Sequence, residues 1–413
     1  MQKTRRLFPV LLLLLALVPR PALAAEFRAE SSTQYLWYLD PFKNDKESDV
    51  VQYVRVGAPQ IDASGRLSAF GYGRLSKQFG GEDDPLLGDD KGVLGRLYYL
   101  YLNYSLPRDQ GEIRLGRQYV SVGAGAGTVD GIRAEVRNLG PVTVSAFAGY
   151  DVRFAETTDR TRDGNYLVGA SAGGSFFKGN TVELSYIRKY DEGDTIREMA
   201  GAHVDQRFLG KAKAYADLRY DLLHNAYSEF LAGVKVFPFS APATFTAEYF
   251  SSYPNFDADT IYTVFAVSRY WEALGRLDYI VNPEWTLYGS FTRADYDGPT
   301  ADVTTLGVRT RPKQIEGFGA NASVAVRRGY PGRLTGFQLS ADYAYKKALL
   351  AAGLTYDVFL RDSMTEDFAA KRYWVGGSYE VRKDLTAKIR VEDNVTRQFA
   401  NEFQGRASVD YRF

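Results

Sequence analysis

The sequence predicts an all-β transmembrane protein, an antiparallel up-and-down β-barrel of about 22 strands, with a range of roughly 18 to 24. Apolar and polar residues alternate in segments of about ten residues, and turn-forming residues separate the segments along the whole chain. The composition agrees, because 30 Tyr and 39 Gly among 413 residues are typical of a chain that is β-structured throughout.

The composition also excludes several classes of function. The chain has no Cys, which excludes disulfide scaffolds, thiol catalysis and thiolate-bound metals or clusters. It has only two His, and 51 Lys and Arg against 50 Asp and Glu give no electrostatic footprint for nucleic acid. We therefore expect no catalytic residues, no metal site and no cofactor.

The first 24 residues have the pattern of a cleaved secretory signal peptide. Lys3, Arg5 and Arg6 precede an apolar run over residues 7–18, and Ala22-Leu23-Ala24 supplies the small-residue cleavage site. The apolar run is shorter than the roughly 20 residues that a membrane-spanning helix needs. Residues 25–413 are then expected to form one domain, and a closed β-barrel is the remaining way for them to span a membrane.

Residues 211–221 illustrate the alternation. Their even positions are apolar or aromatic and their odd positions are mostly charged, so a strand would present one apolar and one polar face. A soluble sandwich core would favour Val, Ile, Leu and Phe, whereas many apolar positions here are Ala, Gly or Tyr. The polar faces of this and similar segments predict pore-lining residues, namely Lys211, Lys213, Asp217, Arg219, Asp221, Glu380, Lys388, Arg390, Glu392, Arg406, Asp410 and Arg412.

The connections between segments predict which end of each strand lies on which rim. Short links rich in Pro, Gly and Asn alternate with longer polar links, as in barrels with short periplasmic turns and long extracellular loops. The longer links include residues 80–91, 123–131 and 253–272. Few residues precede the first strand, so we expect no plug domain.

The last segment has a local signature of its own. Phe403, Val409, Tyr411 and Phe413 share one face with small residues, and the chain stops on the aromatic Phe413. This resembles the terminal strand of bacterial outer-membrane proteins, whose final Phe is read by the barrel assembly machinery. The resemblance implies a Gram-negative outer-membrane location in contact with lipid, with Tyr411 and Phe413 as the assembly signal.

A second local resemblance concerns residues 114–118, which read Arg-Leu-Gly-Arg-Gln and are followed by Asp130-Gly131. This stretch resembles a strand of several porin-like families, including alginate-export-type barrels, and the resemblance implies that Arg and Gln line a channel. Alternation places Arg114 and Gln118 inward. It places Arg117 on the lipid side unless a bulge shifts the register.

Two of the longer links carry separate expectations. Gly123, Gly125 and Gly127 alternate with Ala and predict a tight, flexible outer loop, since no Lys-Ser/Thr follows to complete a phosphate-binding loop. Residues 253–272 break the alternation and predict a constriction loop folded into the lumen, carrying Asp257, Asp259 and Arg269. An extracellular hairpin standing clear of the pore is the alternative for that segment.

The function that fits these observations is a passive, non-enzymatic channel for ions and small hydrophilic solutes. Both signs of charge interleave on the predicted inner face, which argues against sharp selection of one ion. Two alternatives stay open. One is a barrel sleeve that houses a periplasmic or lumen-inserted multihaem cytochrome, and the other is an outer-membrane barrel hydrolase.

Overall fold

A computed structural model describes residues 27–39, 46–79, 93–154, 159–160, 164–238, 241–253, 269–361, 366–397 and 401–413. Twenty-two strands form one sheet, and β8 (Arg153–Phe154) and β9 (Asp159–Arg160) form a separate two-stranded sheet. The barrel strands are β1 (Arg28–Leu39), β2 (Lys46–Ala58), β3 (Leu67–Phe79), β4 (Leu94–Ser105), β5 (Gly111–Val122), β6 (Gly125–Leu139), β7 (Val142–Asp151), β10 (Tyr166–Gly174), β11 (Asn180–Asp191), β12 (Asp194–Phe208), β13 (Ala212–Asp221), β14 (Ala226–Val236), β15 (Ala243–Ser252), β16 (Tyr270–Asn282), β17 (Trp285–Asp295), β18 (Thr300–Thr310), β19 (Phe318–Gly329), β20 (Gly332–Tyr345), β21 (Ala348–Arg361), β22 (Phe368–Arg382), β23 (Leu385–Val395) and β24 (Glu402–Arg412).

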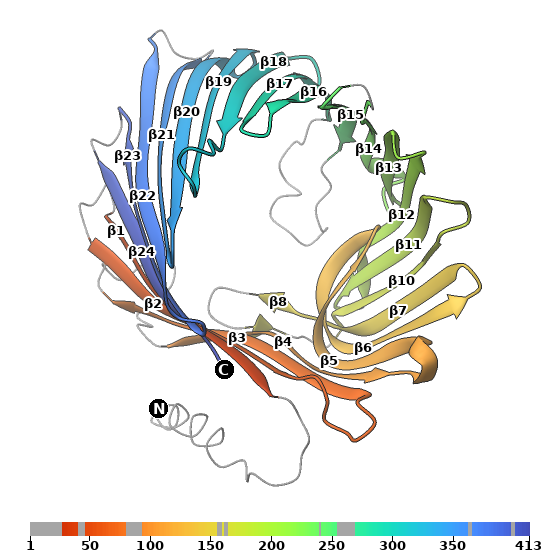
Figure 1. Cartoon of the computed structure of the whole chain (residues 1–413). Coiled ribbons are helices and arrows are strands. Elements are labelled where there is room, and N and C mark those ends of the chain that lie inside the picture. The colour runs from red at the N-terminus through yellow and green to blue at the C-terminus, as the bar shows by residue number, and fades with distance from the viewer. Residues whose placement is uncertain are drawn as a thin grey trace.

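The sheet closes on itself into a barrel (Figure 1). Each barrel strand is antiparallel to the next one along the chain, and β1 pairs with β24 from Glu30↔Arg412 to Tyr38↔Gln404. Backbone hydrogen bonds fasten this seam where the strands end, with Ala29 N donating to Phe413 O at 2.8 Å and Phe413 N donating to Ala29 O at 2.9 Å. The all-β barrel and the expected number of strands are confirmed.

The outer face of the wall is apolar and the inner face is polar, as the alternation predicts. In β22, Tyr373, Val375 and Tyr379 are exposed on the outside, whereas Trp374 and Glu380 point to the other face. Leu184 of β11 is 61% exposed on the outer face, which suits a surface in contact with lipid. Polar inner side chains keep the lumen wet.

The two rims differ in their connections. One rim, here the turn rim, carries the start of β1, the end of β24 and short links such as residues 140–141, 283–284 and 383–384. At the opposite rim, the loop rim, longer stretches of sequence separate the end of β3 from β4, the end of β7 from β10 and the end of β15 from β16. This asymmetry is the one that the turn residues predict.

Some expectations fall outside the described residues. These are the signal peptide over residues 1–24, most of the expected constriction loop including Asp257 and Asp259, and residues 80–92. In the described ranges, no helix has the length and apolar character to cross a membrane.

Candidate functional site

The hairpin made by the ends of β5 and β6 leaves the wall and folds into the lumen (Figure 1). β5 pairs with β4 only from Ser105↔Glu112 to Leu100↔Arg117, and β6 pairs with β7 only as far as Val129↔Asp151. Beyond these points β5 and β6 pair with each other alone, up to a two-residue turn at Gly123 and Ala124. Residues 118–129 are called the inward hairpin below.

A row of three glycines marks the crease where the hairpin turns away. Gly116, Gly131 and Gly149 are direct neighbours across β5, β6 and β7. A Cβ on Gly131 would lie 2.1 Å from Ala148 O, and one on Gly116 would lie 2.4 Å from Leu100 O. Gly116 also has a φ of +125°, which other residues rarely adopt. Glycine is therefore required here, because backbone atoms of neighbouring strands approach too closely for any side chain.

The tip of the inward hairpin is held to the inner wall by hydrogen bonds. Gly123 N donates to a Glu183 carboxylate oxygen at 3.1 Å, and Ala124 N donates to Ser185 Oγ at 2.8 Å. Arg219 Nε donates to Gly123 O at 2.9 Å. Glu183 and Ser185 lie in β11 and Arg219 lies in β13, so the tip crosses several strands of the wall. These bonds satisfy backbone N–H and C=O groups of the tip, which would otherwise pair with a neighbouring strand of the sheet.

Beneath the tip lies a cluster of buried apolar side chains. Val120 and Val129 of the hairpin are at most 1% exposed and face the inner surface of the neighbouring wall. The full cluster consists of Val120, Ala124, Val129, Phe147, Leu167, Ile187 and Met199. Full burial of one such large side chain contributes roughly 1.5–3 kcal/mol. Because seven residues contribute, the hairpin is a fixed part of the fold. The glycine pattern at its tip predicts a flexible outer loop instead. That expectation is wrong.

Arg117 seals the crease from the outside. Its side chain lies on the same side of β5 as Leu115, and the register is continuous, so no bulge turns it inward. Its guanidinium donates from Nε and Nη2 to the two carboxylate oxygens of Asp130, both at 2.8 Å, and from Nη1 to Leu97 O at 3.1 Å. Leu97 lies in the part of β4 that β5 leaves uncovered. This bidentate ion pair and the bond to Leu97 thus connect β5 and β6 to β4 where the hairpin interrupts the hydrogen bonding between β4 and β5.

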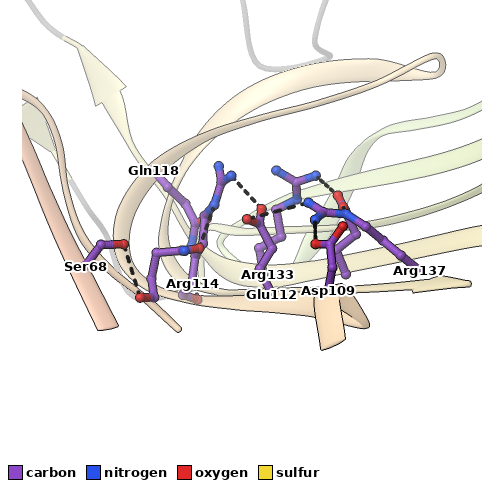
Figure 2. Close-up of polar contacts among 9 residues, drawn as sticks. Ser68, Asp109, Glu112, Arg114, Gln118, Arg133 and Arg137 are labelled. Atoms are coloured by element: carbon purple, nitrogen blue, oxygen red, sulfur yellow. Dashed lines mark hydrogen bonds and ion pairs between the residues drawn. The ribbon is translucent and has the colours of Figure 1, made fainter. Parts of the chain in front are cut away.

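Below the crease a charged row follows the inner face of β5 and β6 towards the turn rim (Figure 2). Arg114 Nη2 lies 2.5 Å from Glu112, Arg133 Nη2 lies 2.7 Å from Glu135, and Arg137 Nε lies 2.6 Å from Glu135. Arg137 Nη1 also donates to Asp109 Oδ1 at 2.8 Å. The charged row is defined as Asp109, Glu112, Arg114, Arg133, Glu135 and Arg137.

The charged row is electrically balanced, since three guanidinium groups face three carboxylates. The Glu112 and Glu135 side chains are 12% and 14% exposed, so they are well shielded, whereas Arg137 is 36% exposed. The charged row presents hydrogen-bond donors and acceptors of both signs and little net field. Such an arrangement can hydrogen-bond polar groups without strongly preferring one charge.

Most of the predicted pore-lining residues lie on the inner face of β13, β22, β23 or β24. In β13, Lys213 pairs with Asp205, Asp217 lies 2.7 Å from His203 Nδ1, and Arg219 lies 2.7 Å from Glu229. The others form a mixed-sign patch in which Lys388 pairs with Asp410 and Glu392 accepts from Arg390 and Gln404. This patch spans Glu380, Lys388, Arg390, Glu392, Arg406, Asp410 and Arg412.

Three predicted pore-lining residues have different surroundings. Gln118 points inward but is 1% exposed, because the inward hairpin covers it. Asp221 is 2% exposed and accepts from the backbone N–H groups of Leu223 and His224, so it caps the β13–β14 turn. Lys211 lies in the turn before β13 and not in a strand. Alternation gives the side of a strand and does not show what covers it.

The inward hairpin is the narrowing element that sequence reasoning missed. The expected constriction loop over residues 253–272 lies largely outside the described residues, but its last three residues, 270–272, belong to strand β16, so the predicted end of the loop is wrong. Where its ends are described, the Arg269 guanidinium stacks 5.3 Å above the Tyr253 ring. The sequence did hold a signal at the crease, since Gly116, Gly131 and Gly149 become neighbours once the three strands are put in register.

Comparison with known proteins gives a fold and no family. Neither a family model nor a curated protein matches the sequence. Among solved structures, the chain is similar to the translocation pore of the P pilus usher PapC, with a TM-score of 0.53 and 9% identity over 93% of this chain and 99% of that chain. The shared feature is the fold.

Two porins are also similar at lower TM-scores. The Pseudomonas aeruginosa protein OpdK with vanillate has a TM-score of 0.45 and 11% identity over 94% of this chain and 98% of that chain. A BenF-like porin from Pseudomonas fluorescens Pf-5 has a TM-score of 0.43 and 13% identity over 94% of this chain and 98% of that chain.

Proposed function

We propose that the protein is a passive, non-enzymatic channel of the bacterial outer membrane for ions and small hydrophilic solutes. The closed wall with an apolar outside and a polar inside supports a membrane-spanning barrel. Barrels of 16 to 18 strands already leave an aqueous channel, so a wall of 22 strands encloses more lumen than its side chains can fill. On this proposal the turn rim is periplasmic and the loop rim is extracellular.

The observation that carries the proposal is the inward hairpin. A wide barrel needs a narrowing element if it is to pass small solutes and retain larger ones. Residues 118–129 supply one, because they extend over the inner wall as far as β13 and are held there by Glu183, Ser185 and Arg219. The balanced charged row next to it suits solutes of either sign and uncharged polar solutes.

The expected loop over residues 253–272 would be a second narrowing element. Arg269, Asp257 and Asp259 are the residues we assign to it, with Arg269 stacked on Tyr253 at the wall. Deleting residues 254–268, which lie between β15 and β16, should then raise conductance further once the inward hairpin has been removed.

The alternative functions gain less support. A cytochrome sleeve needs its lumen for the partner protein, and the inward hairpin already occupies part of it. A hydrolase needs an aimed Ser–His or Asp–His pair, and the structure offers two Asp–His contacts, His203 Nδ1 with Asp217 at 2.7 Å and His224 Nδ1 with Asp221 at 2.9 Å. Asp221 also accepts from two backbone N–H groups of its turn, which suits a structural role for that pair. The channel therefore remains the function that the geometry favours.

Single-channel recording in planar bilayers tests the proposal. The purified protein should give open, ohmic conductance. Replacing residues 119–128 with Asn-Gly joins Gln118 to Val129, which are already paired, through a two-residue turn of the kind that hairpins favour. This variant should conduct more than the natural protein, because the lumen loses its narrowing element.

A matched control shortens another link of the loop rim. Replacing residues 296–299 with Asn-Gly alters the β17–β18 connection and should leave the conductance unchanged. Equal conductance in the natural protein and in the hairpin variant would contradict the narrowing role. Absence of conductance in the natural protein, with haem absorbance in the purified sample, would instead support the sleeve.

A further inference from the structure

The inner wall of β2, β3 and β4 carries a stack of three tyrosines, on other strands than the inward hairpin. The Tyr53 and Tyr72 rings lie 6.2 Å apart at 18°, and the Tyr72 and Tyr98 rings lie 4.9 Å apart at 23°. Tyr72 pairs with Tyr99 and Gly73 pairs with Leu97, so Tyr98 is the extra residue of a β-bulge. The bulge re-aims the Tyr98 side chain and brings it onto the stack.

These rings line a recess of about 520 Å³ that opens to the lumen. Glu30, Arg55 and Arg412 line the same recess. Sites for small molecules usually have volumes of roughly 300–1,000 Å³ and combine apolar or aromatic walls with a few polar groups. The tyrosine recess, defined by Glu30, Tyr53, Arg55, Tyr72, Tyr98 and Arg412, has both features.

Two arginines of the tyrosine recess share one carboxylate. Glu30 lies 3.7 Å from Arg55 and 3.5 Å from Arg412, and the Arg55 guanidinium lies 5.0 Å from the centre of the Tyr72 ring. These charged side chains are half exposed or more, so they can reach a solute in the lumen. The two guanidinium groups therefore share one carboxylate, and the recess offers hydrogen-bond donors and acceptors side by side.

We propose that the tyrosine recess binds a neutral carbohydrate. A sugar ring has an apolar face of C–H groups, which packs well against the negative face of an aromatic ring. Its hydroxyls both donate and accept hydrogen bonds, which matches the paired Glu30 and Arg55. The route by which the sugar reaches the recess rests on the proposed channel function.

Calorimetric titration of the purified barrel in detergent tests the proposal. The probes are maltotriose, sucrose, diacetylchitobiose and sodium benzoate. At least one of the sugars should bind to the natural protein. Tyr72→Leu should weaken its binding at least tenfold because the central ring is lost, whereas Tyr72→Phe should bind within about twofold of the natural protein because the ring remains.

Tyr288→Leu is the matched control. Tyr288 is also an inner-wall tyrosine under arginines, with Arg309 4.6 Å from its ring centre, but it lies in β17. This variant should bind the sugar normally, and heat-dependent migration in gels should show that all variants fold. Binding of benzoate alone, binding of no sugar, or an equal loss in Tyr288→Leu would overturn the proposal. A barrel that binds sugar without conducting would contradict the channel and leave the recess in place.

Discussion

At the scale of single residues, the glycines of the crease determine where the wall can fold inward. Gly116, Gly131 and Gly149 let three strands approach more closely than side chains permit. Arg117 of β5 and Asp130 of β6 then form an ion pair where the hairpin leaves the wall. Lysine could not replace Arg117, because an ammonium group cannot contact both carboxylate oxygens and the Leu97 carbonyl in this planar arrangement.

Substitution at Gly131 should disrupt the crease. In Gly131→Ala the new Cβ would lie 2.1 Å from Ala148 O, so the backbone has to shift, and overpacking of this kind costs about 1–3 kcal/mol. We expect a lower denaturation midpoint in urea for the barrel refolded in lipid vesicles. Gly275→Ala in β16 is the control, because its Cβ would meet nothing within 4 Å. Equal midpoints for the two variants would show that the crease tolerates a side chain.

At the scale of elements, the sequence predicts the faces of strands well and their path poorly. Alternation places Arg114 inward and Leu115 outward, and both positions agree with the structure. The same alternation continues through residues 118–122 whether β5 stays in the wall or leaves it. The departure depends on long-range pairing between β5, β6 and β7, and on how the tip fits Glu183, Ser185 and Arg219, which no local pattern contains.

Neutralising the carboxylates of the charged row should make the channel prefer anions. In Glu112→Gln/Glu135→Gln the arginines of the row lose two of their three carboxylate partners. A unit charge acts on an ion 4 Å away with about 1 kcal/mol in water, which corresponds to roughly a fivefold change in permeability ratio. The reversal potential in a KCl gradient measures this ratio. Glu366→Gln, which removes an exposed partner of Arg397 outside the strands, should leave it unchanged.

At the scale of the whole molecule, the closed sheet takes the place of a single central hydrophobic core. The wall has no free edge because β1 pairs with β24, and its stability comes from neighbouring strands around the ring. Composition, alternation and turn residues suffice to predict such a wall and its strand number. They do not predict what fills the lumen, because residues of distant strands meet there.

The seam between β1 and β24 gives a prediction for assembly. Deleting Phe413 removes an aromatic side chain that packs on Tyr411 and the backbone group that bonds to Ala29. We expect the amount of folded barrel in the outer membrane to fall roughly tenfold, a change equivalent to about 1.4 kcal/mol in an equilibrium. Heat-dependent migration of outer-membrane fractions measures it. Phe177→Ala, at a 76% exposed site of a short turn, should assemble normally, and equal levels of both variants would argue against Phe413 as an assembly signal.

The inward hairpin has one more consequence, which concerns the environment of a single strand. Leu115 and Tyr119 lie on the same side of β5, yet Leu115 is exposed on the outer face of the wall, whereas Tyr119 is 61% exposed beside Arg219 and Ser228 of the inner wall. Because the end of β5 folds inward, the face that points outward at Leu115 points into the lumen at Tyr119. On this side of β5, positions before Arg117 must be apolar, whereas positions after it can be hydrophilic. The side-chain polarity that the surroundings favour therefore changes midway along one continuous β-strand.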